Sequence, residues 1–308
     1  MEYLYTYAFT DEEHPLCKME MRAFFNTDTT GHILNSPREV DPQRSPFIKE
    51  RVAVLKRESS IEKLEQFAAS LSPTGRTFRI EVLNVQGLQT FSFQERKELE
   101  RRIGLHMKDQ ADLRSPDRIF GIVYYNDMWY FGGIRRGKSP WLAHQKRPHG
   151  YSTALNARVA RTIANIAVPD RDGVKVIDPC CGIGTVLLEA CSMGIDIRGS
   201  DRNPKVMNGS RKNLAHFGYF PDVKLQDIAD VSGKFDAAII DMPYNLCSVM
   251  SPEDQEHILK HARRFAERCV IVTIDPADQA VKQAGFTITD RCKFFKNGSF
   301  SREVLSCT

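Results

Sequence analysis

The chain has 308 residues, 42% of them hydrophobic and 27% charged, with a formal net charge of +4. This composition is that of an ordinary globular protein with room for two or three domains. No apolar run approaches the ~20 residues that a bilayer-spanning helix needs, and residues 1–5 lack the basic and apolar segments of a secretory signal. The eight cysteines form no pair of matching Cys-x-x-Cys motifs, which argues against a metal site and a disulfide framework. We therefore expect a cytoplasmic protein with reduced thiols, no bound metal and no membrane partner.

Short helices and strands alternate irregularly in the first half of the chain, which is typical of small α+β domains. Apolar residues at helical spacing predict an amphipathic helix over residues 61–71. Two runs, 119–125 and 128–134, flank Asn126-Asp127 and predict a hairpin. The other expected elements are strands at 3–9, 47–55 and 77–82 and helices at 12–25 and 93–107.

A basic stretch without any Asp or Glu covers residues 128–168. Aromatic residues such as Trp129 and Tyr151 are interleaved with its cations, a composition that suits a phosphate backbone and unstacked bases. A solvated basic face explains the same composition, and the residues alone leave both interpretations open. We treat 137–150 as a basic linker. The residues expected to contact phosphates are Arg135, Arg136, Lys146 and Arg147.

From residue 151 onward, strands and helices alternate regularly, which predicts a parallel, doubly wound α/β sheet. Two runs, 286–295 and 299–307, flank Asn297-Gly298, a strong hairpin turn. A parallel sheet that finishes in an antiparallel hairpin is typical of class I methyltransferases, whereas a dehydrogenase would continue with parallel units. The other expected elements are a helix at 153–167 and strands at 175–177, 196–199, 223–225, 237–240 and 270–274.

A glycine-rich turn follows the first of these strands, at Asp178-Pro179-Cys180-Cys181-Gly182-Ile183-Gly184-Thr185. Its glycines allow the backbone to turn tightly and approach a ligand, and the helix beginning near Thr185 directs its amides toward the same place. Leu187 stands where a dinucleotide fingerprint needs its third glycine, which disfavours a nicotinamide site. Asp178 suits a cation such as the amino group or sulfonium of S-adenosylmethionine. Taken alone, the motif also fits an ordinary strand–helix turn.

Further carboxylates end the next two strands. Asp201 is placed to accept both ribose hydroxyls of a nucleotide-like cofactor. Asp227 is placed to accept the adenine amino group, with Ile228 packed beside the ring. Each aspartate alone fits a helix cap. Carboxylates that end three successive strands favour a cofactor site.

The segment Asp241-Met242-Pro243-Tyr244 follows the apolar run 235–240. An exocyclic amine that donates hydrogen bonds to the Asp241 carboxylate and the Pro243 carbonyl regains electron density on nitrogen and is aimed for in-line attack. Tyr244 offers a stacking face for a base held outside its helix. In isolation the segment fits a capped β-turn with a buried tyrosine. Its position one strand beyond Asp227 favours methyl transfer to the amino group of a base.

The remaining reactive side chains are weaker candidates. Cys180 and Cys181 suggest covalent catalysis, but their place in the cofactor turn favours packing. The histidines are expected to be structural or to lie near phosphates, because no metal-ligand spacing or nearby partner is evident. They are His144, His149, His216, His257 and His261.

These motifs resemble those of the THUMP-containing RNA guanine-N2 methyltransferases, most closely the group that acts on guanosine 10 of tRNA. Two departures are visible: Met242 stands where the family commonly has proline, and Cys180 replaces a bulky apolar residue. The similarity is carried by Asp178-Pro179-x-Cys181-Gly182-x-Gly184-Thr185, Asp241-x-Pro243-Tyr244, Arg147-Pro148 through Ser152, Leu155-x-Ala157-Arg158, Asn165-Ile166-Ala167 and Leu113-x-Ser115-Pro116-Asp117.

The resemblance implies a ferredoxin-like domain over 1–60, a THUMP-like RNA-binding domain over 61–136, the linker over 137–150 and a Rossmann-like methyltransferase domain over 151–308. It implies S-adenosylmethionine as cofactor and guanosine N2 in structured RNA as the acceptor, with tRNA favoured over ribosomal RNA and no protein partner required. The expected catalytic residues are Asp241, Pro243 and Tyr244. The expected cofactor-binding residues are Tyr151, Ser152, Asp178, Cys181, Gly182, Gly184, Thr185, Asp201, Arg202, Asp227 and Ile228.

Two alternatives stay open at this point. Adenine-N6 methylation of DNA uses the same kind of turn, but the THUMP-like front half and the lack of a large target-recognition domain oppose it. A catalytically inert RNA-binding protein that retained the fold is opposed by the intact carboxylates Asp178, Asp201, Asp227 and Asp241.

Overall fold

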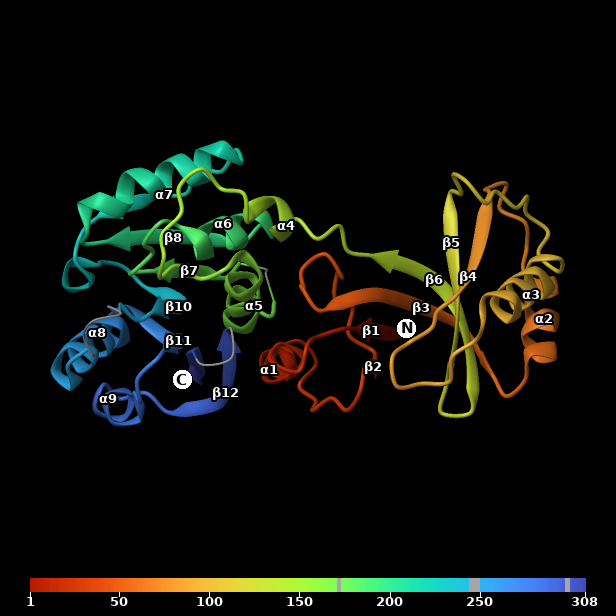
Figure 1. The fold of residues 1–308 in the computed structure, drawn as a ribbon, viewed down its shortest axis with the longest axis horizontal. Coiled ribbons are helices and arrows are strands. Elements are labelled where there is room, and N and C mark those ends of the chain that lie inside the picture. The colour runs from red at the N-terminus through yellow and green to blue at the C-terminus, as the bar shows by residue number, and fades with distance from the viewer. Residues whose placement is uncertain (171–172, 244–249, 297–299) are drawn as a thin grey trace. The chain divides into compact units, whose positions relative to one another are not determined.

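The computed structural model describes residues 1–170, 173–243, 250–296 and 300–308 (Figure 1). The chain forms two compact units, and each contains its own sheet. The first unit consists of Met1–Ala8, Thr29–Gln43 and Phe47–Lys138, and the second of Phe9–Asp28, Arg44–Pro46 and Ser139–Thr308. A segment close to the N-terminus therefore belongs to the second unit. In the described ranges, no helix combines the length and apolar character of a membrane span.

The first unit is a six-stranded sheet in the order β2-β1-β3-β6-β5-β4, in which only β4 and β5 pair in parallel. Helices α2 and α3 pack together, α2 on β3 and α3 on β4. Because β3 pairs with β6, one sheet runs through both 1–60 and 61–136. The elements are β1 (Glu2–Tyr7), β2 (Ile33–Ser36), β3 (Ile48–Glu58), α2 (Ile61–Ser70), β4 (Phe78–Val82), α3 (Phe93–Gly104), β5 (Arg118–Tyr125) and β6 (Met128–Arg136).

The hairpin expected across Asn126-Asp127 is present between β5 and β6. Both turn residues have positive φ, 49° at Asn126 and 58° at Asp127, as a tight two-residue hairpin turn requires. The apolar faces of α2 and the sheet share a core that contains Leu64, Phe120 and Phe131.

The described strands of the second unit form a seven-stranded sheet in the order β12-β13-β11-β10-β7-β8-β9. Strands β7 to β11 pair in parallel, and β12 and β13 add an antiparallel hairpin. The predicted doubly wound α/β fold is confirmed, although the turn Asn297-Gly298 lies outside the described residues. The strands are β7 (Lys175–Asp178), β8 (Asp196–Asp201), β9 (Val223–Leu225), β10 (Phe235–Asp241), β11 (Ala266–Thr273), β12 (Ile288–Lys296) and β13 (Phe300–Cys307).

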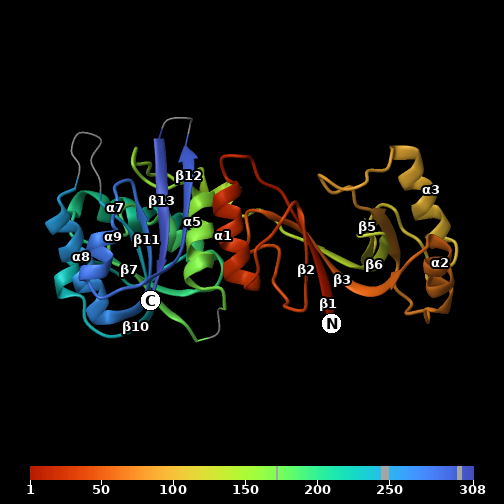
Figure 2. The same ribbon diagram turned by 90° about the horizontal axis from the view of Figure 1, so that it is seen from below.

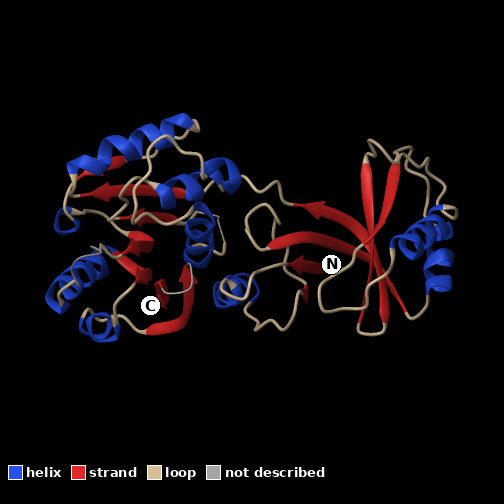
Figure 3. Cartoon of the chain, viewed as in Figure 1, coloured by secondary structure: helices blue, strands red, loops and turns tan. Residues whose placement is uncertain are grey.

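Helices cover both faces of this second sheet (Figure 3). Contacts run from α1 to α5, α6 and α7 in turn, whereas α8 packs on β11 and α9; Figure 2 shows α1 beside α5. Helix α5 begins later than expected because the Asn156 side chain accepts a hydrogen bond from the Val159 amide at 2.7 Å and caps it. The helices are α1 (His14–Phe25), α4 (Trp141–His144), α5 (Ala157–Ala167), α6 (Thr185–Ser192), α7 (Pro204–His216), η1 (Ile228–Asp230), α8 (Pro252–Phe265) and α9 (Asp278–Gln283).

Buried polar groups attach α1 to α5. Glu20 of α1 is fully buried and accepts hydrogen bonds from the Ser45 hydroxyl at 2.5 Å and the Asn165 amide at 2.7 Å. Burial raises the pKa of Glu20 to about 7, while these hydrogen bonds and two nearby arginines oppose that rise. Helix α1 is therefore held in the second unit by polar contacts as well as by packing.

A second buried carboxylate, Glu189 of α6, continues this arrangement. It contacts the Arg161 guanidinium and the His144 Nδ1 atom, each at 2.7 Å. The Arg161 guanidinium also lies over the Trp141 ring. Of the two roles expected for His144, structural or near phosphates, the structure shows the structural one, because α4 carries it onto Glu189 of α6, a partner that the sequence did not reveal. We refer to Glu20, Arg44, His144, Arg161 and Glu189 as the α5 cluster.

Candidate active site

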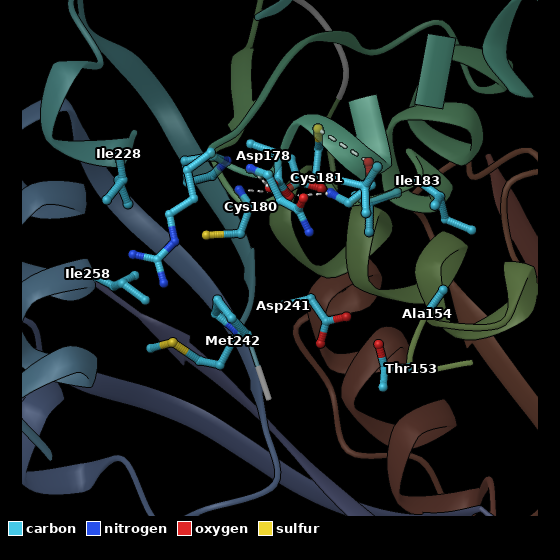
Figure 4. Close-up of a pocket in the computed structure, with 18 of the residues that line it drawn as sticks. Thr153, Ala154, Asp178, Cys180, Cys181, Ile183, Ile228, Asp241, Met242 and Ile258 are labelled. Atoms are coloured by element: carbon cyan, nitrogen blue, oxygen red, sulfur yellow. Dashed lines mark hydrogen bonds between the residues drawn. The ribbon is translucent and has the colours of Figure 1, made fainter. Parts of the chain in front are cut away.

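A cavity of about 540 Å³ lies at the carboxyl edge of the seven-stranded sheet. The strand order reverses between β7 and β10, and such switch points are where open α/β sheets bind ligands. Asp178 ends β7 and Asp241 ends β10, so these carboxylates line the cavity from both sides of the reversal (Figure 4). We call it the switch-point cavity. Its volume is in the range of sites for cofactors and small ligands.

The glycine turn after β7 forms one wall of this cavity. Gly182 and Gly184 have φ values of 53° and 79°, which only glycine adopts without strain. A Cβ atom at Gly184 would also lie 2.6 Å from the Ser210 hydroxyl. The Cys181 amide donates to the Ser200 carbonyl at 2.9 Å, which ties the turn to the end of β8. The turn is thus rigid, and it delivers the N-terminus of α6 to the cavity.

Asp178 and Asp201 face the cavity from neighbouring strands. Asp178 is 2% exposed and accepts the Cys180 amide at 3.1 Å. Asp201 accepts the amides of Gly182 and Asn203, each at 2.8 Å. Burial raises the pKa of Asp178 well above its usual range, and the charges of Asp241 and Asp201 act in the same direction. A bound cation would relieve this accumulation of negative charge.

The Asp241 carboxylate has a hydrogen-bond acceptor that the described residues leave unsatisfied. Its Oδ1 atom is buried and has no hydrogen-bond partner among the residues that the structure describes. Burial raises its pKa to about 7, and the charge of Arg302 opposes the rise. Its carboxylate points toward Thr153, and Thr153 and Ala154 also line the cavity (Figure 4). A buried acceptor without a donor is costly, so this oxygen is arranged to receive an N–H group from a ligand.

The end of the cavity near β9 is more apolar. Ile228 is 6% exposed, and Ile258 of α8 also lines this region (Figure 4). Asp227 caps η1 by accepting the Ala229 amide at 2.9 Å. The capping role considered from the sequence is therefore present, in a residue that also lines the cavity.

The structure brings most of the expected site residues to one cavity. Ser152 and Gly184 do not line it, and Tyr244 lies outside the described residues. Those that line it are Tyr151, Asp178, Cys181, Gly182, Thr185, Asp201, Arg202, Asp227, Ile228, Asp241 and Pro243.

Several lining residues were not identified from the sequence. Thr153 and Ala154 directly follow the expected residues Tyr151 and Ser152, so extending that segment would have found them. Others lie beside predicted residues in the same turns and strands, namely Leu155, Pro179, Cys180, Ile183, Val186, Asn203, Val206 and Met242. A further group comes from α8 and from the segment just before it, where no motif distinguishes its members. These are Met250, Ser251, Asp254, His257 and Ile258.

The cations expected to contact RNA differ in their surroundings. Arg135 pairs with Asp41 at 2.9 Å, and Arg136 pairs with Glu81 at 2.5 Å. Lys146 is exposed. Arg147 is half-buried and donates to the Leu155 carbonyl at 3.4 Å, and its burial lowers its pKa. Two of the four side chains thus already carry carboxylate partners within the first unit.

The residues that line this cavity all lie within a segment that is similar to known proteins. Residues 144–283 match the family model described as RMKL-like, methyltransferase domain. The tRNA (guanine(10)-N2)-dimethyltransferase of Methanothermobacter thermautotrophicus is 30% identical over 173 residues, which cover 53% of this chain and 51% of that protein. The U6 snRNA (guanine-N(2))-methyltransferase THUMPD2 of Mus musculus is 30% identical over 160 residues, 48% of this chain and 29% of that protein.

A solved structure is also similar. TrmN from Thermus thermophilus aligns with a TM-score of 0.48 and 20% identity, covering 100% of this chain and 99% of that one. The curated matches span about half the length of their relatives or less. The expected resemblance to guanine-N2 methyltransferases is confirmed for this portion of the chain.

Proposed function

We propose that the chain transfers a methyl group from S-adenosylmethionine to the N2 amino group of a guanosine in structured RNA, with position 10 of tRNA as the favoured target. The observation that carries this proposal is the buried Oδ1 atom of Asp241, which lacks a donor beside a rigid glycine turn at the switch point. Relatives named for guanine N2 favour this acceptor over adenine N6.

The residues around the cavity fit the cofactor. When bound, S-adenosylmethionine supplies a methyl group attached to a positively charged sulfur. Asp178, whose pKa is raised by burial and by neighbouring carboxylates, would offer negative charge to the cofactor's cation. Asp201 is held by two backbone amides and is oriented for ribose hydroxyls. Ile228 and Ile258 supply apolar surface for adenine, with Asp227 close to its amino group.

Asp241 and Pro243 would orient the acceptor amine. An ionised Asp241 accepts one N–H, and the Pro243 carbonyl accepts the other. These bonds shift electron density toward the nitrogen and fix the direction of its lone pair, so that positioning supplies much of the rate. As the nitrogen–methyl bond forms, the methyl–sulfur bond would break with its electron pair kept by sulfur, which leaves as a neutral thioether, and the surplus amine proton would pass to the Asp241 carboxylate. Tyr244 remains our proposed stacking residue.

The remaining expectations extend this proposal to the whole chain. We propose that residues 1–60 and 61–136 serve as ferredoxin-like and THUMP-like modules and 137–150 as the linker. RNA contacts are proposed for Lys146 and Arg147, and for Arg135 and Arg136 where RNA phosphates displace their carboxylate partners. A cytoplasmic location, and function without a protein partner, also stay predictions.

An assay with labelled methyl donor and unmodified tRNA tests the proposal. Asp241→Ala should lower the methylation rate about 100-fold or more, as loss of an oriented charged group in an active site does, and leave cofactor affinity nearly intact. Asp196→Asn, at an exposed site at the start of β8, is the control. Nucleoside mass spectrometry should identify N2-methylguanosine. Undiminished turnover by Asp241→Ala, or methylation of another base, would refute the proposal.

A further inference from the structure

The C-terminal hairpin carries a buried arginine to the carboxyl edge of the sheet, on the face of Asp241. In the sheet, Asp241 pairs with Val272 of β11, and Val272 pairs with Val304 of β13. Side chains alternate along a strand, so Arg302 lies on the same face as Val304. Because β13 is antiparallel to β11, Arg302 is displaced toward the carboxyl edge, where the cavity opens. Its side chain is 3% exposed, an unusual degree of burial for arginine.

Arg302 holds the wall of the cavity that faces Asp241. Its Nη2 atom donates to the Thr153 carbonyl at 2.8 Å, and Thr153 lies across from Asp241 (Figure 4). The other end of the same segment is held at His149, whose amide donates to the Asn213 side chain at 2.8 Å. The segment therefore has one anchor on α7 and another on β13.

The positive charge of Arg302 also acts on Asp241. Among the described residues, five of the ten ionisable groups that line the cavity are aspartates, and Arg302 is the group whose charge opposes the effect of burial on the pKa of Asp241. It acts from β13, two strands along the sheet from Asp241, and is not among the residues that line the cavity, where a cationic cofactor would lie. The ionisable groups that line the cavity are Tyr151, Asp178, Cys180, Cys181, Asp201, Arg202, Asp227, Asp241, Asp254 and His257.

We propose that Arg302 is a positioning residue for methyl transfer, which anchors the Thr153 wall and keeps a fixed positive charge near the Asp241 carboxylate, outside the lining of the cavity. This role rests on the proposed function, because it concerns the same acceptor site. Arg302 touches neither substrate nor cofactor; it acts through Asp241 and Thr153. In its absence, more of the Asp241 population is protonated at neutral pH and accepts the amine poorly.

Three variants separate the two contributions. Arg302→Gln keeps a hydrogen-bond donor but removes the charge, Arg302→Lys keeps the charge, and Arg302→Met removes both. Arg291→Gln, at an exposed position on β12, is the matched control. Titration of the Asp241 carboxyl by ¹³C NMR, assigned with Asp241→Asn, needs neither cofactor nor RNA. The second readout is the pH dependence of tRNA methylation.

The Gln and Met variants should titrate Asp241 above its wild-type value of about 7, whereas the Lys and control variants should not. Because the ionised carboxylate is the active form, the acidic limb of the rate profile should move to higher pH. At pH 6.5 the Gln variant should be about threefold slower or more relative to wild type, with a smaller loss at pH 9. Affinity for S-adenosylhomocysteine should change little.

An unchanged Asp241 titration in Arg302→Gln would overturn the proposal, as would an equal loss of rate at every pH. Should Arg302→Met fail to fold, the comparison of Gln with Lys still decides the question, because both keep a polar side chain. Absence of RNA methylation by the wild type would instead refute the proposed function and, with it, a role in that reaction. The NMR titration would still report whether Arg302 acts on Asp241, so the two failures are distinguishable.

Discussion

The α5 cluster and the switch-point cavity both contain buried carboxylates of the second unit. They differ in the hydrogen-bond partners that the chain provides for those carboxylates. Burial raises the pKa of Glu20 in the cluster and of Asp241 in the cavity to about 7. Both Glu20 oxygens accept hydrogen bonds from the chain. At Asp241 the Oδ1 atom has no donor among the described residues.

The partners of these groups explain the difference. In the cluster, Glu189 contacts Arg161 and His144, so its charge is neutralised inside the fold. In the cavity, the charges of Asp241 and Asp201 add to the effect of burial and raise the pKa of Asp178 further. A buried carboxylate with a complete set of internal partners supports the fold, whereas one that lacks them is placed for a ligand. The carboxylates of the cavity therefore lower the stability of the folded protein, whereas the partnered carboxylates of the cluster do not.

Breaking the cluster should have the largest effect on stability. Glu189→Ala leaves the Arg161 guanidinium buried without its carboxylate, and losing one partner of a buried pair costs about 3–5 kcal/mol. Urea unfolding, followed through Trp141 in a Trp129→Phe background, measures the loss. Glu98→Ala, which removes an exposed pair with Arg101, should cost less than about 1 kcal/mol. Equal losses of stability in the two variants would contradict the expectation that the buried pair stabilises the fold more than the exposed pair does.

Neutralising Asp241 should instead raise the stability of the folded protein. The pKa of this group is about 7 in the folded protein and about 3.9 when unfolded. The folded state therefore binds the proton more tightly, and stability falls as pH rises from about 4 to about 7. Asp241→Asn avoids that loss, so its advantage should be small at pH 4 and grow to at most about 4 kcal/mol at pH 8. Melting temperatures at both pH values test this; an advantage that does not grow with pH contradicts it.

The parallel sheet of the second unit was predictable because its strands are buried on both faces and read as short apolar runs. The attachment of α1 to this unit was not. It depends on contacts such as Glu20 with Asn165, which are 145 positions apart, and no local pattern encodes such a pairing. Strand β2 was also missed, because four residues are too few to establish an alternating pattern.

The residues of the candidate site also fall into those that the sequence predicts and those that only the structure reveals. Asp178 and Asp241 were predictable because each directly follows an apolar strand, and parallel strands bring their carboxyl ends to one edge. His257 and Ile258 were missed because they lie on a helix whose orientation depends on packing. Arg302 was missed because an arginine in an alternating strand resembles a solvent-facing residue. Only the tertiary structure shows that it is buried.

Asp201, which ends β8, and Asp227, which follows β9 and caps η1, should differ in how they tolerate asparagine. Both Asp201 oxygens accept backbone amides, so Asp201→Asn must turn its NH₂ group toward a donor and should cost about 1–3 kcal/mol. The Oδ1 atom of Asp227 caps η1, and asparagine caps equally well, so Asp227→Asn should change stability by less than about 0.5 kcal/mol. Chemical denaturation of the cofactor-free protein at pH 7 measures both. If Asp201→Asn leaves the stability unchanged, the amide contacts of Asp201 do not hold the glycine turn, and the turn depends on packing alone.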